Sequence, residues 1–367
     1  MSVNNIINIK SNNSEIFIGD DVFNVLKEYI RPYQDKKIFI LVDENTLQHC
    51  IPELITQIEY LQNAEIIEIN SGEENKSLDI CYQIWKTLSD YKADRQSLLI
   101  NVGGGVISDM GGFIASTFKR GIDFINVPTT LLSQIDASVG GKVGVDFEGL
   151  KNMIGCFNEP KGVFIYPNFL KTLDKRQVLS GYAEALKHGL INDKKYWIEL
   201  KKGMLSDTKN WLKLITTSIN IKNKIVLADP KEKSERKLLN FGHTIGHALE
   251  TYSLNNDELL YHGEAIAIGL ICEAYISSKI MGLSELELKD ISTIIFNLYS
   301  TYKFEDSDFH QLIELMKKDK KNKKQAINFT LISEIGKAHI DKEVTVEIIL
   351  DALNYYNSLA KKENNSN

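Results

Sequence analysis

The sequence lacks three features that would place it in a specialised class of protein. Its four cysteines, Cys50, Cys81, Cys156 and Cys272, are scattered with no paired spacing, which is typical of small buried side chains in a reducing compartment. No apolar run is long enough to span a membrane. Residues 1–14 are rich in asparagine and contain no apolar stretch typical of a signal peptide. We therefore expect a cytoplasmic protein without a membrane partner.

An excess of positive charge is also lacking. Lysine and arginine number 43 against 49 aspartates and glutamates, which gives a formal net charge of −6. A nucleic-acid-binding protein normally carries a basic face, so this balance argues against nucleic acid as a partner. It leaves room for local basic pockets that bind an acidic small molecule.

Histidine is scarce, and its distribution is uneven. The chain has seven histidines, and His243, His247 and His262 fall within twenty residues. Four-residue spacing on a helix puts His243 and His247 on one face, with Arg236 and Asn240 further back on nearly the same side. Such a face suits Zn²⁺, although a buried pair of packing histidines is about equally common. The third histidine and the neighbouring glycines favour a metal site.

The length of 367 residues and the texture of the chain indicate two domains. We expect an α/β domain over residues 1–174 and a mostly helical domain over residues 175–367. Short apolar runs alternate with helical periodicity in the first part, which is typical of a parallel sheet covered on both faces. The expected strands are Lys37–Val42, Glu65–Asn70, Ser97–Val102, Phe124–Val127 and Gly162–Tyr166, with helices at Thr46–Leu61 and Lys76–Tyr91.

The second part shows long helical patterns and one alternating patch that predicts a hairpin. The expected helices are Lys175–Asn192, Thr208–Ala228, Lys237–Tyr252, Gly263–Met281, Ser284–Leu298 and Val344–Ala360, and the hairpin joins Ala326–Ile332 to Gly336–Ile340. A lysine-rich run over residues 317–324 is more typical of a solvated loop than of a phosphate clamp.

A glycine loop follows the third expected strand. Gly103, Gly104 and Gly105 would let backbone N–H groups approach a phosphate at the start of a helix, for which Ser108 is a plausible N-cap. Ser108 also occupies the third glycine position of the dinucleotide fingerprint, so the loop alone is equally compatible with a tight turn. Asp43, at an earlier strand end, could bind a ribose hydroxyl and favours a nucleotide site.

Basic residues beside glycines continue through the middle of the chain. Arg120, Lys142 and Lys151 lie in glycine-flanked segments near strand ends, which suggests an anion pocket as much as a solvated surface. Glu184 and Lys187 lie one turn apart on a helix, where a surface ion pair is the ordinary interpretation. Glu184 could equally supply the carboxylate that a catalytic zinc site takes beside two histidines.

Six ordered motifs together resemble the 3-dehydroquinate synthase family, within the sugar phosphate cyclase superfamily. They are Gly-Gly-Gly-Val-Ile-Ser-Asp, Val-Pro-Thr-Thr-Leu-Leu-Ser-Gln-Ile-Asp-Ala-Ser-Val-Gly-Gly-Lys, Leu-Lys-Asn-Met-Ile-Gly, Ala-Glu-Ala-Leu-Lys, Leu-Asn-Phe-Gly-His-Thr-Ile-Gly-His-Ala-Leu-Glu and His-Gly-Glu-Ala. The resemblance runs from about Asp43 to Ile340. It implies a Rossmann-like NAD site in the α/β domain, an active site in the cleft between the domains, and a homodimer.

The resemblance also implies a reaction. Members convert 3-deoxy-D-arabino-heptulosonate 7-phosphate into 3-dehydroquinate and phosphate, a lyase step of the shikimate pathway toward chorismate and the aromatic amino acids. They use NAD⁺, which is reduced and reoxidised within each turnover, and a divalent metal, usually Zn²⁺ with Co²⁺ as a possible substitute. Phosphate elimination, re-reduction and an intramolecular aldol closure complete the reaction.

Family roles can be assigned to this chain residue by residue. The expected metal ligands are Glu184, His243 and His262. His247 is expected to move protons at the oxidised carbon. The expected substrate contacts are Lys142, Asn152, Arg120 from the other subunit, Lys187, Lys222, Arg236, Asn240, Asp136 and Lys320 or Lys321. The expected NAD contacts are Asp43, Glu73, Lys76, Gly104, Gly105, Val106, Asp109, Thr129, Thr130, Lys142 and Lys151.

The departures from the family pattern are small, and three other interpretations compete. Ser108 replaces a common glycine and Tyr182 a smaller residue, but neither is a reacting group. Related cyclases act on sedoheptulose 7-phosphate or glucose 6-phosphate, which lack the carboxylate that Lys222 and Arg236 are expected to bind. A metal-dependent polyol dehydrogenase would release NADH, and a non-enzymatic nucleotide-binding module would need none of the reacting groups.

Overall fold

The computed structural model describes residues 6–203, 209–254, 259–299, 302, 304–318 and 327–364. The backbone forms two compact units. The first comprises Met1–Val178 and Leu205–Asn223, and the second comprises Leu179–Met204 and Lys224–Asn367. The domain boundary suggested by the sequence, near residue 174, stays a prediction. None of the helices in the described ranges combines the length and apolar composition that crossing a bilayer requires.

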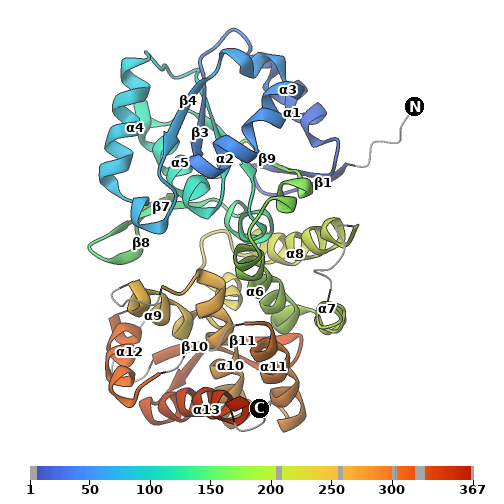
Figure 1. Cartoon of the computed structure of the whole chain (residues 1–367), viewed down its shortest axis with the longest axis vertical. Helices are drawn as coiled ribbons and strands as arrows, with labels where there is room; N and C mark the ends of the chain where they lie inside the picture. The colour runs from blue at the N-terminus through green and yellow to red at the C-terminus, as the bar shows by residue number, and fades with distance from the viewer. Residues whose placement is uncertain are drawn as a thin grey trace. The chain divides into compact units, whose positions relative to one another are not determined.

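The first unit contains a seven-stranded sheet whose middle is parallel (Figure 1). Its strands are β1 (Ile7–Lys10), β2 (Glu15–Ile18), β3 (Ile38–Asp43), β4 (Glu65–Ile69), β5 (Leu98–Gly103), β6 (Asp123–Pro128) and β9 (Gly162–Ile165). They are ordered β1-β2-β9-β6-β5-β3-β4, and only β1 and β2 pair antiparallel. All five strands expected from the sequence are present, and β1 and β2 were not expected. The predicted α/β class with a mostly parallel sheet is confirmed.

Helices cover both faces of this sheet, as the continuous apolar strands predict. In β3, Ile38, Ile40 and Val42 face one core, and Phe39 and Leu41 face the other. The helical segments of this unit are α1 (Val22–Ile30), η1 (Arg31–Tyr33), α2 (Glu44–His49), α3 (Ile51–Gln57), η2 (Glu59–Asn63), η3 (Glu73–Asn75), α4 (Leu78–Asp90), α5 (Gly105–Thr117), η4 (Phe118–Arg120), the π-helix η5 (Ser133–Ala137), η6 (Pro167–Lys171) and the first part of α8 (Lys209–Ala228).

The single helix expected over Thr46–Leu61 is wrong. The chain instead forms α2, α3 and η2, with a junction at Cys50. Pro52 sits in the first turn of α3, where its missing N–H costs nothing but where a continuous helix would lose a hydrogen bond. The apolar periodicity survives this junction, so the pattern could not show the break.

An antiparallel hairpin, β7 (Lys142–Phe147) with β8 (Leu150–Phe157), was also not expected. Its glycines looked like loop residues, but here they allow close packing. A Cβ on Gly144 would lie 2.6 Å from the carbonyl oxygen of Ile154. A Cβ on Gly112 of α5 would lie 2.4 Å from Val143 Cγ1, so the hairpin packs closely on that helix.

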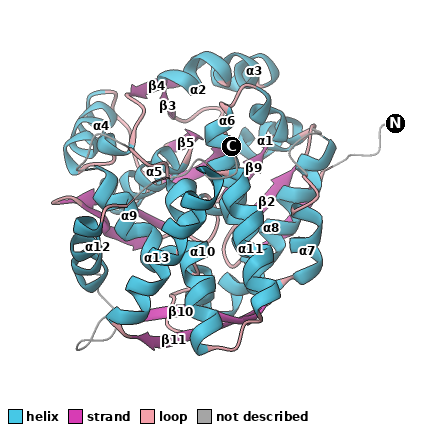
Figure 2. Cartoon of the chain, turned by 60° about the horizontal axis from the view of Figure 1, so that its bottom comes forward, coloured by secondary structure: helices cyan, strands magenta, loops and turns pink. Residues whose placement is uncertain are grey.

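The second unit is mostly helical, as predicted (Figure 2). Its helices are most of α6 (Lys175–Asn192), α7 (Lys194–Leu200), the end of α8, the 3₁₀ segment η8 (Glu235–Asn240), α9 (His243–Leu254), α10 (His262–Ile280), α11 (Glu285–Leu298), α12 (Asp306–Lys318) and α13 (Val346–Asn364). The predicted hairpin is present as β10 (Ile327–Glu334) paired with β11 (Lys337–Val344). Most residues of α10 are buried, and this helix packs against α9, α11, α13 and β10.

The helix expected over Lys237–Tyr252 begins later than predicted. Residues 235–240 form η8, the chain turns at Gly242 with φ of +82°, and α9 starts at His243. Arg236 and Asn240 therefore do not continue the helical face of His243 and His247. A left-handed residue cannot lie inside an α-helix, and here glycine takes that conformation without a steric penalty.

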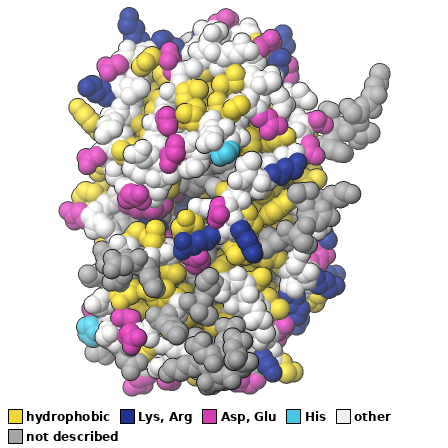
Figure 3. Space-filling view, in the orientation of Figure 1, with side chains coloured by type: hydrophobic (Ala, Val, Ile, Leu, Met, Phe, Trp, Pro, Cys, Tyr) yellow, Lys and Arg dark blue, Asp and Glu magenta, His cyan; other side chains and the backbone are white. Residues whose placement is uncertain are grey.

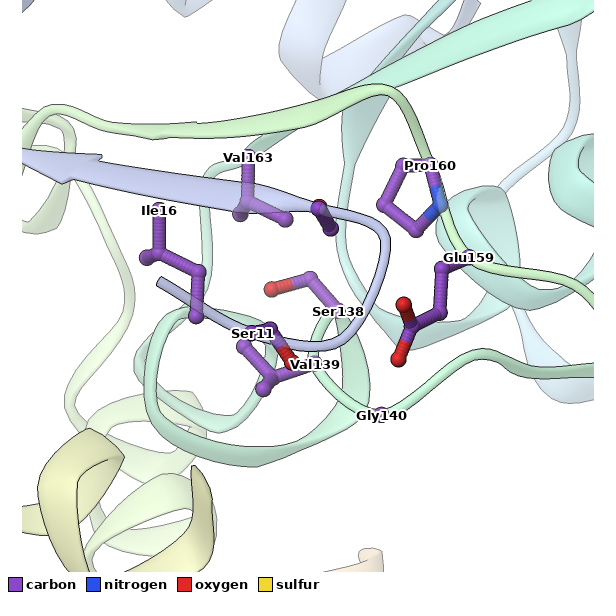
Figure 4. Close-up of a pocket in the computed structure, with 9 residues that line it drawn as sticks. Ser11, Ile16, Ser138, Val139, Gly140, Glu159, Pro160 and Val163 are labelled. Carbon is purple, nitrogen blue, oxygen red and sulfur yellow. The ribbon is translucent and has the colours of Figure 1, made fainter. Parts of the chain in front are cut away.

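Two surface features complete the description. On the face drawn in Figure 3, acidic and basic side chains of the described residues are interspersed, with hydrophobic side chains between them. A small pocket in the first unit is lined by Ser11, Ser138, Gly140, Glu159 and their neighbours (Figure 4). Glu159 accepts a hydrogen bond from the backbone of Asn13 at 2.6 Å. None of the expected metal, substrate or NAD residues lines this pocket, although Ser138, Val139 and Gly140 belong to one of the six motifs.

Candidate functional site

Three side chains from different helices of the second unit meet at one point. Glu184 on α6 is fully buried, and His243 and His262 are the first residues of α9 and α10. Glu184 Oε1 lies 3.3 Å from His243 Nε2 and 3.1 Å from His262 Nε2. The ligand atoms of the three residues all lie within 4.8 Å of one another. One carboxylate and two imidazoles are a donor set that catalytic zinc sites use.

Hydrogen bonds at the other ring nitrogens orient both imidazoles. His243 Nδ1 lies 3.1 Å from the carbonyl oxygen of Phe241, and His262 Nδ1 lies 3.1 Å from Glu250 Oε2. Both partners are acceptors, so we assign the hydrogen of each neutral ring to Nδ1. With the rings neutral, each Nε2 would then carry the lone pair that metal coordination requires.

The charges around these residues favour a cation. Burial alone would raise the pKa of Glu184, but Lys187 and His243 hold that pKa well below its ordinary value of 4.5. Burial and nearby Lys187 lower the pKa of His243. Burial opposes protonation of His262 as well, yet Glu250 and Glu184 raise the pKa of this ring to about 10. The negative charge that holds a proton on His262 would equally attract a divalent ion.

His247 lies beside this cluster, one turn along α9. Its ring centroid is 5.0 Å from that of His243 in an edge-to-face arrangement, and 6.3 Å from that of His262. The group of metal-ligating atoms includes Glu184, His243 and His262, and His247 is outside it. The four-residue spacing therefore places the two histidines side by side, but only His243 directs a ring nitrogen into the group of metal-ligating atoms.

Other expected residues of the second unit occupy defined places. Lys187 is buried and forms an ion pair with Glu184. Arg236 is buried in η8, where its Nη1 donates to the carbonyl oxygen of Pro230 at 2.8 Å. Asn240 Nδ2 donates to Glu232 Oε1 at 3.0 Å. Lys320 and Lys321 lie outside the described residues.

A second group of expected residues lies in the first unit, at the carboxyl ends of its parallel strands. Asp43 ends β3 and caps α2 by accepting the N–H of Thr46 at 2.8 Å. Glu73 follows β4, and Gly104 and Gly105 follow β5. Because β4 and β5 flank β3, the chain reverses its winding direction here, and such a switch point is where open α/β sheets bind ligands.

The glycine loop leaves the start of α5 open to a ligand. Gly104 is the N-cap, with no side chain to cap the helix, and the first turn contains no acidic residue. A Cβ on Gly104 would lie 3.1 Å from Thr130 Cγ2. The N–H of Thr129 donates to the carbonyl oxygen of Gly103 at 3.0 Å, which joins the β6 end to the loop. The prediction that Ser108 is the N-cap is wrong, because Ser108 lies inside α5 and its hydroxyl donates to the carbonyl oxygen of Gly105.

Several expected NAD and phosphate residues form one polar network beside this loop. Lys76 Nζ lies 2.8 Å from Asp109 Oδ2 and 2.6 Å from Asn152 Oδ1. Lys151 Nζ lies 3.3 Å from Glu73 Oε1. Burial alone would lower the pKa of Lys76, but Asp109 and Glu73 raise it well above its ordinary value, so the amine stays charged.

The remaining expected residues of the first unit are placed individually. Lys222 on α8 forms an ion pair with Asp136 of η5, with Nζ 2.9 Å from Oδ1. Lys142 begins β7 and is exposed. Arg120 is exposed with φ of +69°. Val106 lies in the first turn of α5 and is half-buried.

The sequence reasoning missed Glu250 and Glu273, which contact this histidine region. Glu250 accepts from His262, as described above. Glu273 is fully buried on α10 and accepts the N–H of Gly242 at 2.6 Å and that of Ile245 at 3.2 Å. A lone carboxyl group within the apolar run of α10 was a readable signal, because such a group rarely stays buried without partners.

Comparisons with known proteins agree with this arrangement. The 3-dehydroquinate synthase N-terminal family model matches residues 66–180, and the C-terminal model matches residues 181–322. The chain belongs to the 3-dehydroquinate synthase family. A 3-dehydroquinate synthase of Parabacteroides distasonis is 43% identical over 344 residues, which cover 93% of this chain and 97% of that protein. The predicted family, and with it a lyase activity, is confirmed.

Solved structures of two synthases share the fold. A 2-deoxy-scyllo-inosose synthase in complex with carbaglucose-6-phosphate, NAD⁺ and Co²⁺ matches with a TM-score of 0.84 at 23% identity, covering 95% of this chain and 99% of that one. A 2-epi-5-epi-valiolone synthase from Streptomyces hygroscopicus with NAD⁺ and Zn²⁺ bound matches with a TM-score of 0.81 at 24% identity, covering 95% and 98%.

Proposed function

We propose that this 3-dehydroquinate synthase family member converts 3-deoxy-D-arabino-heptulosonate 7-phosphate into 3-dehydroquinate and phosphate, with a divalent metal held by Glu184, His243 and His262. The observation that carries the proposal is the convergence of these ligand atoms within 4.8 Å of one another. Zn²⁺ is the metal we favour, with Co²⁺ as a substitute, since both accept nitrogen and oxygen donors. A metal bound there would act as a Lewis acid on substrate hydroxyl groups.

NAD⁺ is the cofactor we propose for the carboxyl ends of the parallel strands. The uncapped start of α5 presents backbone N–H groups to a diphosphate, and Asp43 is placed at a strand end for a ribose hydroxyl. Thr129, Thr130, Val106 and Asp109 would line the same pocket. NAD⁺ bound there would supply a reversible hydride acceptor, so no net formation of NADH is expected.

The chain's own residues would orient the substrate and move protons. His247 is proposed as the proton carrier, because its imidazole lies next to the ligand cluster and an imidazole nitrogen can accept and donate a proton. Arg236 is proposed to bind the substrate carboxylate, since a guanidinium can grip both oxygens. Lys142, Asn152 and Arg120 remain predicted contacts of the substrate phosphate, and Lys222 of the carboxylate and hydroxyls. Asp136 remains a further predicted substrate contact, and Lys151 a predicted NAD⁺ contact. A homodimer and a cytoplasmic location stay predictions.

The test measures phosphate and 3-dehydroquinate from the purified protein with the heptulosonate phosphate, a catalytic amount of NAD⁺, and Zn²⁺. Phosphate release without net NADH is the expected result. Accumulation of NADH from a polyol, without phosphate, would contradict the proposal and indicate a dehydrogenase. Turnover of sedoheptulose 7-phosphate or glucose 6-phosphate in place of the heptulosonate would contradict the assignment of Arg236.

A pair of variants tests the metal site separately. His262→Ala is expected to abolish turnover and stoichiometric Zn²⁺ binding together. His310→Ala is the matched control, because His310 is an exposed histidine of α12 in the same unit. Stoichiometric Zn²⁺ and unchanged turnover in His262→Ala would remove His262 from the ligand set.

A further inference from the structure

The two histidines of the proposed metal site occupy equivalent positions in their helices. His243 is the first residue of α9, and His262 is the first residue of α10. The position of a side chain in the first turn depends on how its helix begins, and helix ends fray unless their free backbone N–H groups find hydrogen-bond acceptors. Each histidine could therefore move away from Glu184 if its helix start loosened.

A carboxyl group of α9 holds the start of α10. The Glu250 side chain is only 3% exposed, and its Oε2 lies 3.1 Å from Nδ1 of His262. This contact fixes the ring plane and leaves Nε2 toward Glu184, 3.1 Å away. Glu250 comes two turns after His243 on the same helix, so α9 supplies both one histidine and the partner of the other.

A carboxyl group of α10 holds the start of α9, here through backbone N–H groups and not through the histidine ring. Glu273 is fully buried, and it accepts the N–H of Gly242 at 2.6 Å and the N–H of Ile245 at 3.2 Å. These two groups bracket His243 in the chain. The side chain therefore caps α9 from a neighbouring helix and fixes the turn that projects the histidine.

The backbones of the two helices are also in close contact. A Cβ on Gly269 of α10 would lie 2.0 Å from the carbonyl oxygen of Gly242, and one on Gly246 of α9 would lie 2.7 Å from Ile266 Cδ1. Such packing allows little independent sliding of the helices. A shift of either carboxyl group would then be transmitted to the histidine it supports.

We propose that Glu250 and Glu273 are a reciprocal pair of positioning residues, each fixing the metal-binding histidine at the start of the other's helix. The inference rests on the proposed metal site. Neither side chain belongs to the group of ligating atoms around Glu184. Their role is to keep both Nε2 atoms directed at one point, so their loss is expected to weaken metal binding.

Measuring the Zn²⁺ affinity of the purified full chain shows whether the two glutamates position the histidines or only support the fold. Zn²⁺ is removed, and its dissociation constant is measured by competition with a chromophoric chelator for wild type, Glu250→Gln, Glu250→Ala, Glu273→Gln and Glu273→Asp. Asp290→Asn is the matched control, because this carboxylate of α11 in the same unit accepts from Trp197 and Lys201 instead. Circular dichroism and the melting temperature of each metal-free protein report folding, and Co²⁺ absorption reports ligand geometry.

Glu250→Gln and Glu273→Gln are each expected to raise the Zn²⁺ dissociation constant by about 10- to 100-fold and to change the Co²⁺ spectrum. Glu250→Gln keeps an acceptor for His262, so it should bind more tightly than Glu250→Ala. Glu273→Asp keeps the carboxyl group but reaches less far, so it should also bind weakly. Asp290→Asn should stay within about twofold of wild type.

Three outcomes would overturn the inference. Wild-type Zn²⁺ affinity in both glutamine variants, with only a lower melting temperature, would show support of the fold alone. An effect on affinity in one variant only would refute the reciprocal arrangement. Failure of the wild-type protein to bind Zn²⁺ would refute the proposed metal site itself, whereas the first two outcomes leave that site intact.

Discussion

Replacing Lys76 with methionine is expected to destabilise the first unit through the carboxylate it leaves behind. The Lys76 side chain is 4% exposed, and its Nζ contacts Asp109 at 2.8 Å and Asn152 at 2.6 Å. Methionine retains the apolar stem but removes the charge and the donors. Asp109 would then keep a half-buried negative charge without its lysine.

The expected magnitude follows from that loss. Breaking a buried ion pair by removing one partner costs about 3–5 kcal/mol. The Asp109 side chain is 21% exposed, so water would solvate part of its charge. We therefore expect Lys76→Met to lower the free energy of unfolding by about 2–3 kcal/mol. Asp109→Asn should cost less, because Glu73 remains 3.9 Å from Lys76 Nζ.

The cost should depend on pH in a defined direction. Burial raises the pKa of Asp109 above 3.8, and Lys76 opposes that rise. Without Lys76 the folded-state pKa would rise further. A carboxyl group with a raised folded pKa contributes stability below its unfolded pKa and loses it as pH rises through the folded pKa. The deficit of Lys76→Met should thus be smallest near pH 4 and grow toward pH 7.

The assay is denaturant unfolding, monitored by circular dichroism, of the wild type, both single variants and the double variant. Hydrogen exchange of the β5 and α5 amides is measured as well. The double-variant cycle should give a coupling energy of about 1–2 kcal/mol between Lys76 and Asp109. A deficit in Lys76→Met below about 0.5 kcal/mol, or one that shrinks as pH rises, would refute this account of the pair.

Three further changes probe other parts of the molecule. Gly104→Ala should weaken NAD⁺ binding by about tenfold in calorimetry. The melting temperature should fall only slightly, because the φ of −76° suits alanine although the new Cβ would lie 3.1 Å from Thr130 Cγ2; unchanged affinity would move the diphosphate elsewhere. Gly263→Ala should lower the free energy of unfolding by about 1–3 kcal/mol in denaturant titrations, since its Cβ would meet the Ser180 carbonyl oxygen at 2.0 Å; wild-type stability would contradict this steric account. Burial raises the pKa of Glu273 from 4.5 to about 8, so in the metal-free protein the stability advantage of wild type over Glu273→Gln should fall as pH rises from 4.5 to 8; a constant or growing difference would show that Glu273 does not titrate there.

Much of the first unit could be predicted because its central strands β3, β5, β6 and β9 are buried on both faces. Runs such as Leu98–Gly103 are apolar except for Asn101 and show no polar alternation, and this is a strong signal of a central parallel strand. The hairpin of β7 and β8 escaped notice because its glycines and lysines are typical of loops. What permits its pairing is the close approach of Gly144 to the backbone of β8, and no period in the sequence reveals such a contact.

At the site, too, local sequence patterns predicted some features, and tertiary packing decides the others. Histidine spacing indicated a cluster, and the family resemblance separated His243 from His247. The spacing also suggested that Arg236 continues the same helical face, which the turn at Gly242 rules out. Hydrogen bonds that orient a ligand come from distant positions, as Glu250 does for His262. Such partners follow from helix packing, which local periodicity does not encode.

The buried position of Glu273 illustrates why the metal site and the fold of the second unit are hard to separate. An apolar residue at this point would suit the surroundings of α10 better, since moving a carboxyl group out of water is unfavourable. The backbone N–H groups of Gly242 and Ile245 offset part of that cost, and they are donors that α9 itself cannot satisfy. An apolar replacement would leave both donors buried without this acceptor, which costs about 1–3 kcal/mol for each such group. The carboxyl group therefore supplies the acceptor that the start of α9, with its histidine, needs there.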